Sequence, residues 1–190
     1  MTSRREVVIA GHRGDLATIR HGVTDADAVV RASALGALDR AGALTASDLS
    51  AAANDGDFRV RRRAAELAAR YPDVDLMIFL HDTDDLVVEM AAWSCGERAE
   101  TPEVIIHRLS ELTTGRDDAL VREAAVAALG AIGDERGLPA ILHAVGDKPA
   151  VRRRAVIALA PFEGPEVDAA YAQALKDRDW QVRQAAEDLT

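Results

Sequence analysis

Side chains that could bind a metal ion or act as a nucleophile are few in this sequence and form no known motif. The five histidines are followed by Arg, Gly, Asp, Arg and Ala, and they share no register with one another: His12, His21, His81, His107 and His143. A metal site needs several His, Cys or carboxylate ligands at suitable spacings. No Gly-rich phosphate loop, paired-cysteine motif or serine nucleophile motif occurs either. We therefore expect no catalytic residue, no metal and no cofactor.

Two runs of three arginines are chemically more distinctive. They are Arg61-Arg62-Arg63 and Arg152-Arg153-Arg154. Successive residues of an α-helix turn by about 100°, so the three arginines of a run point in different directions. The middle arginine should lie on the helix face opposite a buried valine. It is either a solvated side chain or part of a contact surface, and the sequence leaves both readings open.

The arginine runs belong to a unit whose clearest copy spans residues 118–142. Apolar residues at helical spacing share one face there: Val121, Ala125, Ala128, Leu129 and Ile132. An acidic residue, Asp118, precedes this predicted helix and suits its start. Gly130 and Gly133 are expected to loosen and end the helix, and a second helix begins at Leu138. The unit is a helix, a turn and a helix.

The same unit recurs along the chain. A valine followed by a charged residue appears six times, at steps of 30, 28, 33, 30 and 31 residues: Val30-Arg31, Val60-Arg61, Val88-Glu89, Val121-Arg122, Val151-Arg152 and Val182-Arg183. Alanine stands four positions after every valine: Ala34, Ala64, Ala92, Ala125, Ala155 and Ala186. The residue three before the valine is acidic in five units: Asp27, Asp57, Asp85, Asp118 and Asp179, with Lys148 in the other. The alignment predicts stacked helix pairs with inward alanines, in one domain of residues 1–190. Residues 4–11 are the truncated first unit of this domain.

The pattern Asp-x-x-Val-Arg-x-x-x-Ala-x-x-Ala-Leu-Gly resembles HEAT-like repeats of the phycobilisome-lyase (E–Z) type, from about residue 15 onward. The resemblance implies an all-α fold, an α-α superhelix (a HEAT-like solenoid) of about six helix pairs, with the Val-Arg helices on its concave side. That family ranges from chromophore lyases and an iron hydroxylase to adaptors without chemistry. The hydroxylase branch uses His-Glu pairs as iron ligands, and this sequence contains none.

The resemblance also implies a role for the arginine that follows each valine. It should pair with acidic residues in the turns, such as Asp25, Asp55 and Asp177, and so tie one repeat to the next. A ladder of binding arginines is the alternative, and the structural role is favoured because the spacing persists where the rest of the helix varies. Exposed pairs of this kind contribute about 0–1 kcal/mol each, and more if they are partly buried.

The third unit departs from the pattern. In this alignment it has Glu89 in place of arginine, where it could bridge Arg61 and Arg122, and Gly96 in place of leucine. We expect Trp93 to refill the missing volume, with a binding hot spot as the alternative. Cys95 falls at an inward position, so a buried small side chain is favoured over a nucleophile.

The candidate partner-binding residues follow from this alignment. Four of them occupy one position in the second to fifth Val-Arg helices and Trp93 lies close by: Arg62, Met90, Trp93, Glu123 and Arg153. A partner with acidic groups near both ends and an apolar residue between them would complement the set.

Composition narrows the class of protein. Apolar residues make up 48% of the chain and aromatic residues 4%, so the core must be built from Ala, Leu, Val and Ile. The net charge of −9 argues against nucleic-acid binding. One cysteine, no signal-like start and no apolar segment long enough for a membrane favour a cytoplasmic protein. Arginine far outnumbers lysine, which hints at a GC-rich bacterial genome.

These observations favour a non-catalytic interaction scaffold that binds a protein or peptide along the concave face. We expect a monomer without membrane contact. A lyase- or hydroxylase-related enzyme is the alternative, and a nucleic-acid-binding protein is a third.

Overall fold

The computed structural model describes residues 2–190 and is built from helices. Thirteen α-helices and one short 3₁₀ helix make up its regular structure, and no strand occurs within residues 2–190. The chain divides into two compact units, Met1–Ser94 and Cys95–Thr190, and the boundary falls inside α7. None of the helices in residues 2–190 is long and apolar enough to cross a bilayer.

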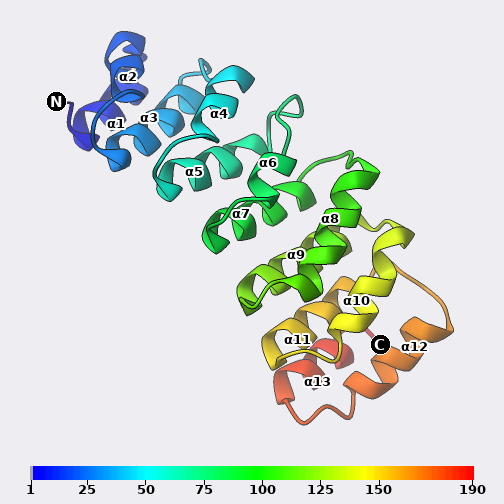
Figure 1. Ribbon diagram of the computed structural model, residues 1–190. Helices are drawn as coiled ribbons and strands as arrows, with labels where there is room; N and C mark the ends of the chain where they lie inside the picture. The colour runs from blue at the N-terminus through cyan, green and yellow to red at the C-terminus, as the bar shows by residue number, and fades with distance from the viewer. Residues whose placement is uncertain (1) are drawn as a thin grey trace. The chain divides into compact units, whose positions relative to one another are not determined.

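The first unit begins with a single helix and continues with helix pairs. Its helices are α1 (Arg4–Arg13), α2 (Leu16–Gly22), α3 (Ala28–Arg40), α4 (Ala46–Ala52), α5 (Phe58–Ala68), α6 (Met77–Leu80) and α7 (Asp85–Gly96). In this unit α3 packs on both α1 and α5, while α2 and α4 pack on the helices that follow them (Figure 1). The predicted truncated unit is therefore α1, which extends to Arg13.

The second unit continues the same alternation of helices. It contains α8 (Glu103–Gly115), α9 (Ala119–Ile132), the 3₁₀ helix η1 (Glu135–Gly137), α10 (Leu138–Ala144), α11 (Pro149–Ala158), α12 (Pro165–Ala174) and α13 (Trp180–Glu187). Here α11 packs between α9 and α13, and each of α8, α10 and α12 contacts its successor (Figure 1). We call the later member of each pair the second helix of its repeat.

Aspartates start the second helices as predicted. The side chains of Asp27, Asp57, Asp118 and Asp179 each accept a hydrogen bond from the backbone N–H two residues later, at 2.7–2.9 Å. A helix leaves its first N–H groups without backbone partners, and these carboxylates satisfy one of them. Lys148 makes no such bond, and Pro149 begins α11 instead.

The inward alanines are also confirmed. Ala34, Ala64, Ala125, Ala155 and Ala186 are all completely inaccessible to solvent. Because a methyl group is small, adjacent helices can approach closely at these points. The core of each unit is accordingly lined by alanine and branched aliphatic residues.

The glycines of α9 act differently from one another. Gly133 has a φ of 67° and ends the helix as predicted, since this conformation strains other residues. Gly130 does not loosen the helix. A Cβ atom built on it would lie 2.6 Å from the Cα atom of Ala158, so its lack of a side chain lets α9 and α11 pack closely.

Candidate functional site

Four arginine–aspartate pairs join successive repeats within the two units. In each pair the arginine Nε and Nη2 atoms donate to both oxygens of one aspartate, at 2.6–2.9 Å: Arg31 with Asp55, Arg61 with Asp82, Arg122 with Asp147 and Arg152 with Asp177. The Nη1 atom of each arginine donates to a backbone carbonyl of the turn before its own helix. Each guanidinium therefore holds two successive turns together.

Electrostatics reinforce these pairs. The hydrogen bonds from Arg122 lower the pKa of the Asp147 carboxyl, and the same contact raises the pKa of Arg122. Arg31 and Arg152 likewise lower the pKa values of Asp55 and Asp177. Burial opposes the charged form of Asp82, yet its bonds with Arg61 and the backbone still lower its pKa. Two-point pairing of this kind is the stronger class of ion pair.

The predicted inter-repeat role of the arginines is confirmed for Asp55 and Asp177. It is wrong for Asp25, whose carboxylate accepts from the backbone N–H groups of Thr2 and Asp27 at 2.9 and 3.0 Å. The reason is that α1 starts at Arg4, so the backbone of Thr2 reaches Asp25 where another repeat would supply an arginine.

The register of α7 differs by one residue from the predicted one. The side chain of Asp84 accepts from the Leu86 N–H, and its backbone carbonyl accepts from Val87 and Val88, as Asp27 does in α3. Asp84, not Asp85, is thus the equivalent of Asp27. The recurring valine is Val87, and the alanine four positions after it is Ala91, which is fully buried, as is the predicted Ala92. An Asp-x-Asp pair precedes three other second helices. The same pair in Asp82-Thr83-Asp84 is the sequence signal that could have given the correct register of α7.

The corrected register changes three interpretations. Val88, and not Glu89, occupies the arginine position, and it is fully buried. The proposed bridge by Glu89 is wrong, because Arg61 pairs with Asp82 and Arg122 with Asp147. Gly96 matches Gly130, since a Cβ on it would lie 3.2 Å from the Cα of Ala128.

Trp93 does not fill a gap in the core. Its side chain is 46% exposed, so the packing interpretation is wrong. The leucine position of α7 is occupied by Cys95, which is buried as predicted, and burial raises the pKa of its thiol to about 12. A thiol with that pKa stays protonated near neutral pH and is a poor nucleophile.

The first unit carries a surface patch that we call the first-unit patch: Arg62, Glu66, Glu89, Met90 and Trp93. Arg62 lies two positions after Val60, and Glu89 holds the same position on α7, where the prediction had placed Met90. Met90 lies one position further on. All these side chains except that of Trp93 are half-buried. Arg62 has a buried Nε atom with no hydrogen-bond partner.

The second unit carries the remaining predicted residues. Glu123 on α9 forms an ion pair of 3.4 Å with Arg154 on α11. Arg153 has no carboxylate partner within the part of the unit that the structure describes. Ile157, one helical turn after Arg153, is 41% exposed and was not predicted. The candidate residues thus fall into two groups, one in each unit.

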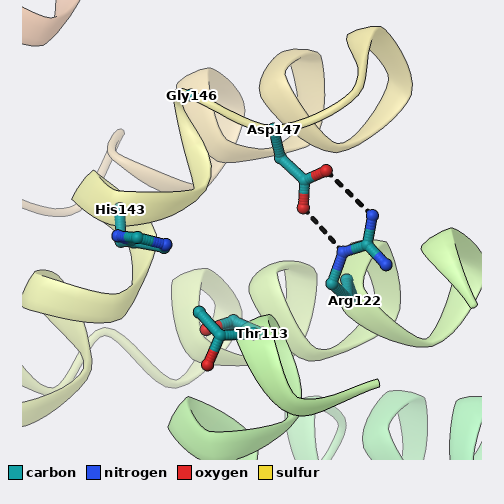
Figure 2. A pocket seen from close by; sticks show the side chains of 6 residues that line it. Thr113, Arg122, His143, Gly146 and Asp147 are labelled. Carbon is teal, nitrogen blue, oxygen red and sulfur yellow. Dashed lines mark hydrogen bonds and ion pairs between the residues drawn. The ribbon is translucent and has the colours of Figure 1, made fainter. Parts of the chain in front are cut away.

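A cleft of roughly 310 Å³ in the second unit lies beside the Arg122–Asp147 pair (Figure 2). It is lined by Thr113, Thr114, Arg122, His143, Gly146 and Asp147. The guanidinium donates to Asp147 and to the carbonyls of Arg116 and Asp117, and the Thr113 hydroxyl donates to the Ser110 carbonyl. These polar groups are satisfied within the protein, and we assign the cleft no ligand.

The five histidines are all solvent-exposed. No group of three or more His, Cys, Asp or Glu side chains within residues 2–190 is placed to hold a metal ion.

Comparison with known families gives a match for part of the chain. Residues 74–160 match the family model of HEAT repeats. Over this segment, which is less than half of the chain, the sequence is similar to HEAT repeats. The match is to HEAT repeats in general, so the resemblance to the phycobilisome-lyase type remains a prediction. No curated protein sequence matches this chain significantly.

Solved structures share the HEAT-like helical fold. The Escherichia coli protein YibA is 17% identical, with a TM-score of 0.67 over 98% of this chain and 73% of its own. A designed armadillo repeat protein in complex with the peptide (KR)4 is 18% identical, with a TM-score of 0.52 over 97% and 84%. Human deoxyhypusine hydroxylase is 19% identical, with a TM-score of 0.51 over 98% and 77%. At these identities the similarity shows the fold alone.

Proposed function

We propose that this chain is a non-catalytic interaction module that binds a protein or peptide segment across the exposed face of its second helices. The observation that carries the proposal is the first-unit patch. There α7 carries an exposed tryptophan, and α5, the preceding second helix, carries an arginine that has no carboxylate partner among the described residues. Tryptophan and arginine are the residues most often responsible for binding energy at protein interfaces.

The arginine–aspartate pairs support the same proposal. They fix successive second helices to the turns of the next repeat within each unit, so the face between them is held in place before a partner arrives. A preorganised surface loses less conformational entropy on binding than a mobile one. A designed armadillo repeat protein with a similar fold is in complex with a peptide, (KR)4, which supports peptide binding by such a fold.

The alternative is an enzyme like deoxyhypusine hydroxylase, which shares the fold. We favour binding, because the described residues offer no cluster of metal ligands and fold similarity does not transfer activity. Nucleic-acid binding is disfavoured by the net charge of −9.

A random peptide display library, selected against the immobilised chain, tests the proposal. Trp180, which is 64% exposed, can be replaced by phenylalanine so that Trp93 is the only fluorescent indole. We expect enriched peptides to shift the Trp93 emission, and Trp93→Ser to weaken their binding about tenfold or more.

The matched control is Ile78→Ser on α6. Ile78 is 43% exposed, close to the exposure of Trp93, but it lies on a first helix. Peptides that bind Trp93→Ser normally and lose affinity for Ile78→Ser would overturn the proposal, and so would a library that yields no binder.

A further inference from the structure

We propose that the first-unit patch selects an extended peptide with one carboxylate that binds Arg62 and an aliphatic or aromatic side chain that packs on Trp93. This inference rests on the proposed function and names the chemistry of its partner. Its evidence is the ion pairing of α5, the same arrangement on α11 and the position of Trp93.

The arginines of α5 differ in their partners. Arg59 pairs with Asp57 at 3.4 Å, Arg61 with Asp82 at 2.6 Å and Arg63 with Glu66 at 2.7 Å. Arg62 has no carboxylate among the described residues, and its Nε atom is buried without a hydrogen-bond partner. The Arg62 side chain is only half-buried, so part of it is open to a ligand, and a carboxylate that accepts from the guanidinium forms a charge-assisted hydrogen bond.

Glu66 does not neutralise Arg62, because it is bound to Arg63. The guanidinium of Arg63 in turn lies over Gly36 of α3, where an added Cβ atom would clash with Nη2. Arg63 therefore packs on α3 while it pairs with Glu66 of its own helix. Arg62 is left as the free positive charge of the patch.

The second unit repeats the arrangement on α11. Arg152 pairs with Asp177 and Arg154 with Glu123, whereas Arg153, at the position of Arg62, has no carboxylate partner in that unit. An exposed apolar residue, Ile157, lies one helical turn after this arginine on the same helix, whereas Trp93 lies on the second helix that follows that of Arg62. Two separate units therefore combine an unpaired arginine with an exposed apolar side chain.

The position of Trp93 sets the spacing within the peptide. The Ser94 hydroxyl donates to the Ala65 carbonyl at 2.7 Å in a buried contact between α7 and α5, next to Trp93 in the sequence, and so ties this part of the α7 backbone to α5. Packed helix axes lie about 8–10 Å apart. Arg62 is two positions after its recurring valine and Trp93 is six positions after its own, so Trp93 is displaced by four residues, or about 6 Å, along the helix axis. An extended chain advances about 3.3 Å per residue, so the carboxylate and the apolar side chain should be about three or four residues apart.

Glu89 restricts the acidity of the peptide. It holds the same register position on α7 as Arg62 on α5, and it would repel a second carboxylate close to the first. The patch therefore suits a single acidic residue, not an acidic run.

The same library selection, run in parallel against the wild type and against Arg62→Gln, tests the carboxylate specificity of the first-unit patch. We expect Asp or Glu to be enriched about three or four residues from an apolar position with the wild type only.

One enriched peptide is then synthesised with its carboxylate and as the matching amide. Its Kd is measured from the Trp93 emission in the Trp180→Phe background. We expect the Arg62→Gln substitution and the amide peptide each to raise Kd about tenfold. The two changes together should weaken binding no further than either alone, because they remove one interaction. Arg59→Gln on the same helix is the control and should leave Kd unchanged.

The outcomes separate the two proposals. Peptides that shift Trp93 emission but lack an acidic position, or that bind Arg62→Gln as tightly as the wild type, overturn the carboxylate specificity and leave the interaction module standing. A selection that yields no peptide acting on Trp93 overturns both. The amide peptide tests the contact on unmodified protein even if Arg62→Gln folds poorly.

Discussion

An arginine on these second helices has a role that depends on its distance from the recurring valine. Directly after the valine, Arg122 reaches the turn of the next repeat and is held by Asp147. One position later, Arg153 has no carboxylate partner in its unit. The first position should therefore matter for stability and the second for binding.

Arg122→Ala is expected to lower the free energy of unfolding by about 2–4 kcal/mol. The Arg122 and Asp147 side chains are only 10% and 19% exposed, so the change leaves a carboxylate partly buried without its partner. Arg153→Ala should change the same quantity by less than about 0.5 kcal/mol. Urea unfolding of both variants measures this, and equal losses would contradict the division of roles.

Acid should weaken the paired turns. The carboxyl pKa values of Asp55, Asp82, Asp147 and Asp177 are lowered in the folded protein. Their stabilising contribution is present above the unfolded-state pKa of about 4 and is lost as the pH falls through the lower folded values. Unfolding free energy, measured by urea titration at a series of pH values, should therefore decline below about pH 4. Arg122→Ala should show a shallower decline.

The residues of these pairs could be predicted only in part from the sequence. Recurrence of Val-Arg indicated that the arginines are structural, and Asp55 and Asp177 were correctly assigned. The sequence could not show that Arg62 lacks a carboxylate partner, because Arg63 competes for Glu66 and only the folded geometry shows which arginine is bound. The alternation of apolar positions likewise gave no sign that Ile157 would be exposed.

At the scale of elements, close approach between second helices depends on small residues. Gly130 meets the backbone of Ala158 directly, and Gly96 meets that of Ala128. Periodicity predicted the existence of these helices and their alanine face. It failed by one residue in α7, because Val87 and Val88 are chemically alike and three aspartates nearby allow two alignments.

Gly130→Ala should lower the free energy of unfolding by about 1–3 kcal/mol. Alanine favours a helix, but its Cβ would lie 2.6 Å from the Cα and 2.9 Å from the carbonyl oxygen of Ala158. Gly115→Ala is the control, since no atom lies within 4 Å of its built Cβ, and it should stabilise by up to about 1 kcal/mol. Thermal melts in parallel compare them, and a stabilised Gly130→Ala would show that the helices can separate without loss.

At the scale of the whole molecule, the outer residues of α13 differ from those of α9 and α11. Glu187 stands at the register position of Val126 and Val156, which are buried. In the second unit, Val156 packs against Val182, Ala185 and Ala186 of α13. The equivalent side of α13 instead carries a polar contact of 2.8 Å between Gln184 and Asp188. Polar residues at such an edge keep a repeat array soluble.

We therefore expect the chain to be monomeric. Light scattering over a range of concentrations should give one monomer mass. Glu187→Val would add an apolar side chain to an end of α13 that already exposes Leu189, two residues later, and should produce concentration-dependent association. Glu166→Val on α12 is the control and should remain monomeric. A wild-type dimer that does not dissociate on dilution would contradict this prediction.

Unfolding should proceed by segments, because each repeat of such an array contacts mainly its neighbours. Ala64→Leu in the first unit and Ala125→Leu in the second replace fully buried alanines, and each should destabilise by about 1–3 kcal/mol through overpacking. Hydrogen exchange read by mass spectrometry should then show lost protection mainly around α5 for the first variant and around α9 for the second. If either variant lowered protection equally over all helices, the chain would unfold as one cooperative body. If neither changed the melting temperature, the alanine position would not be the tight contact that the structure shows.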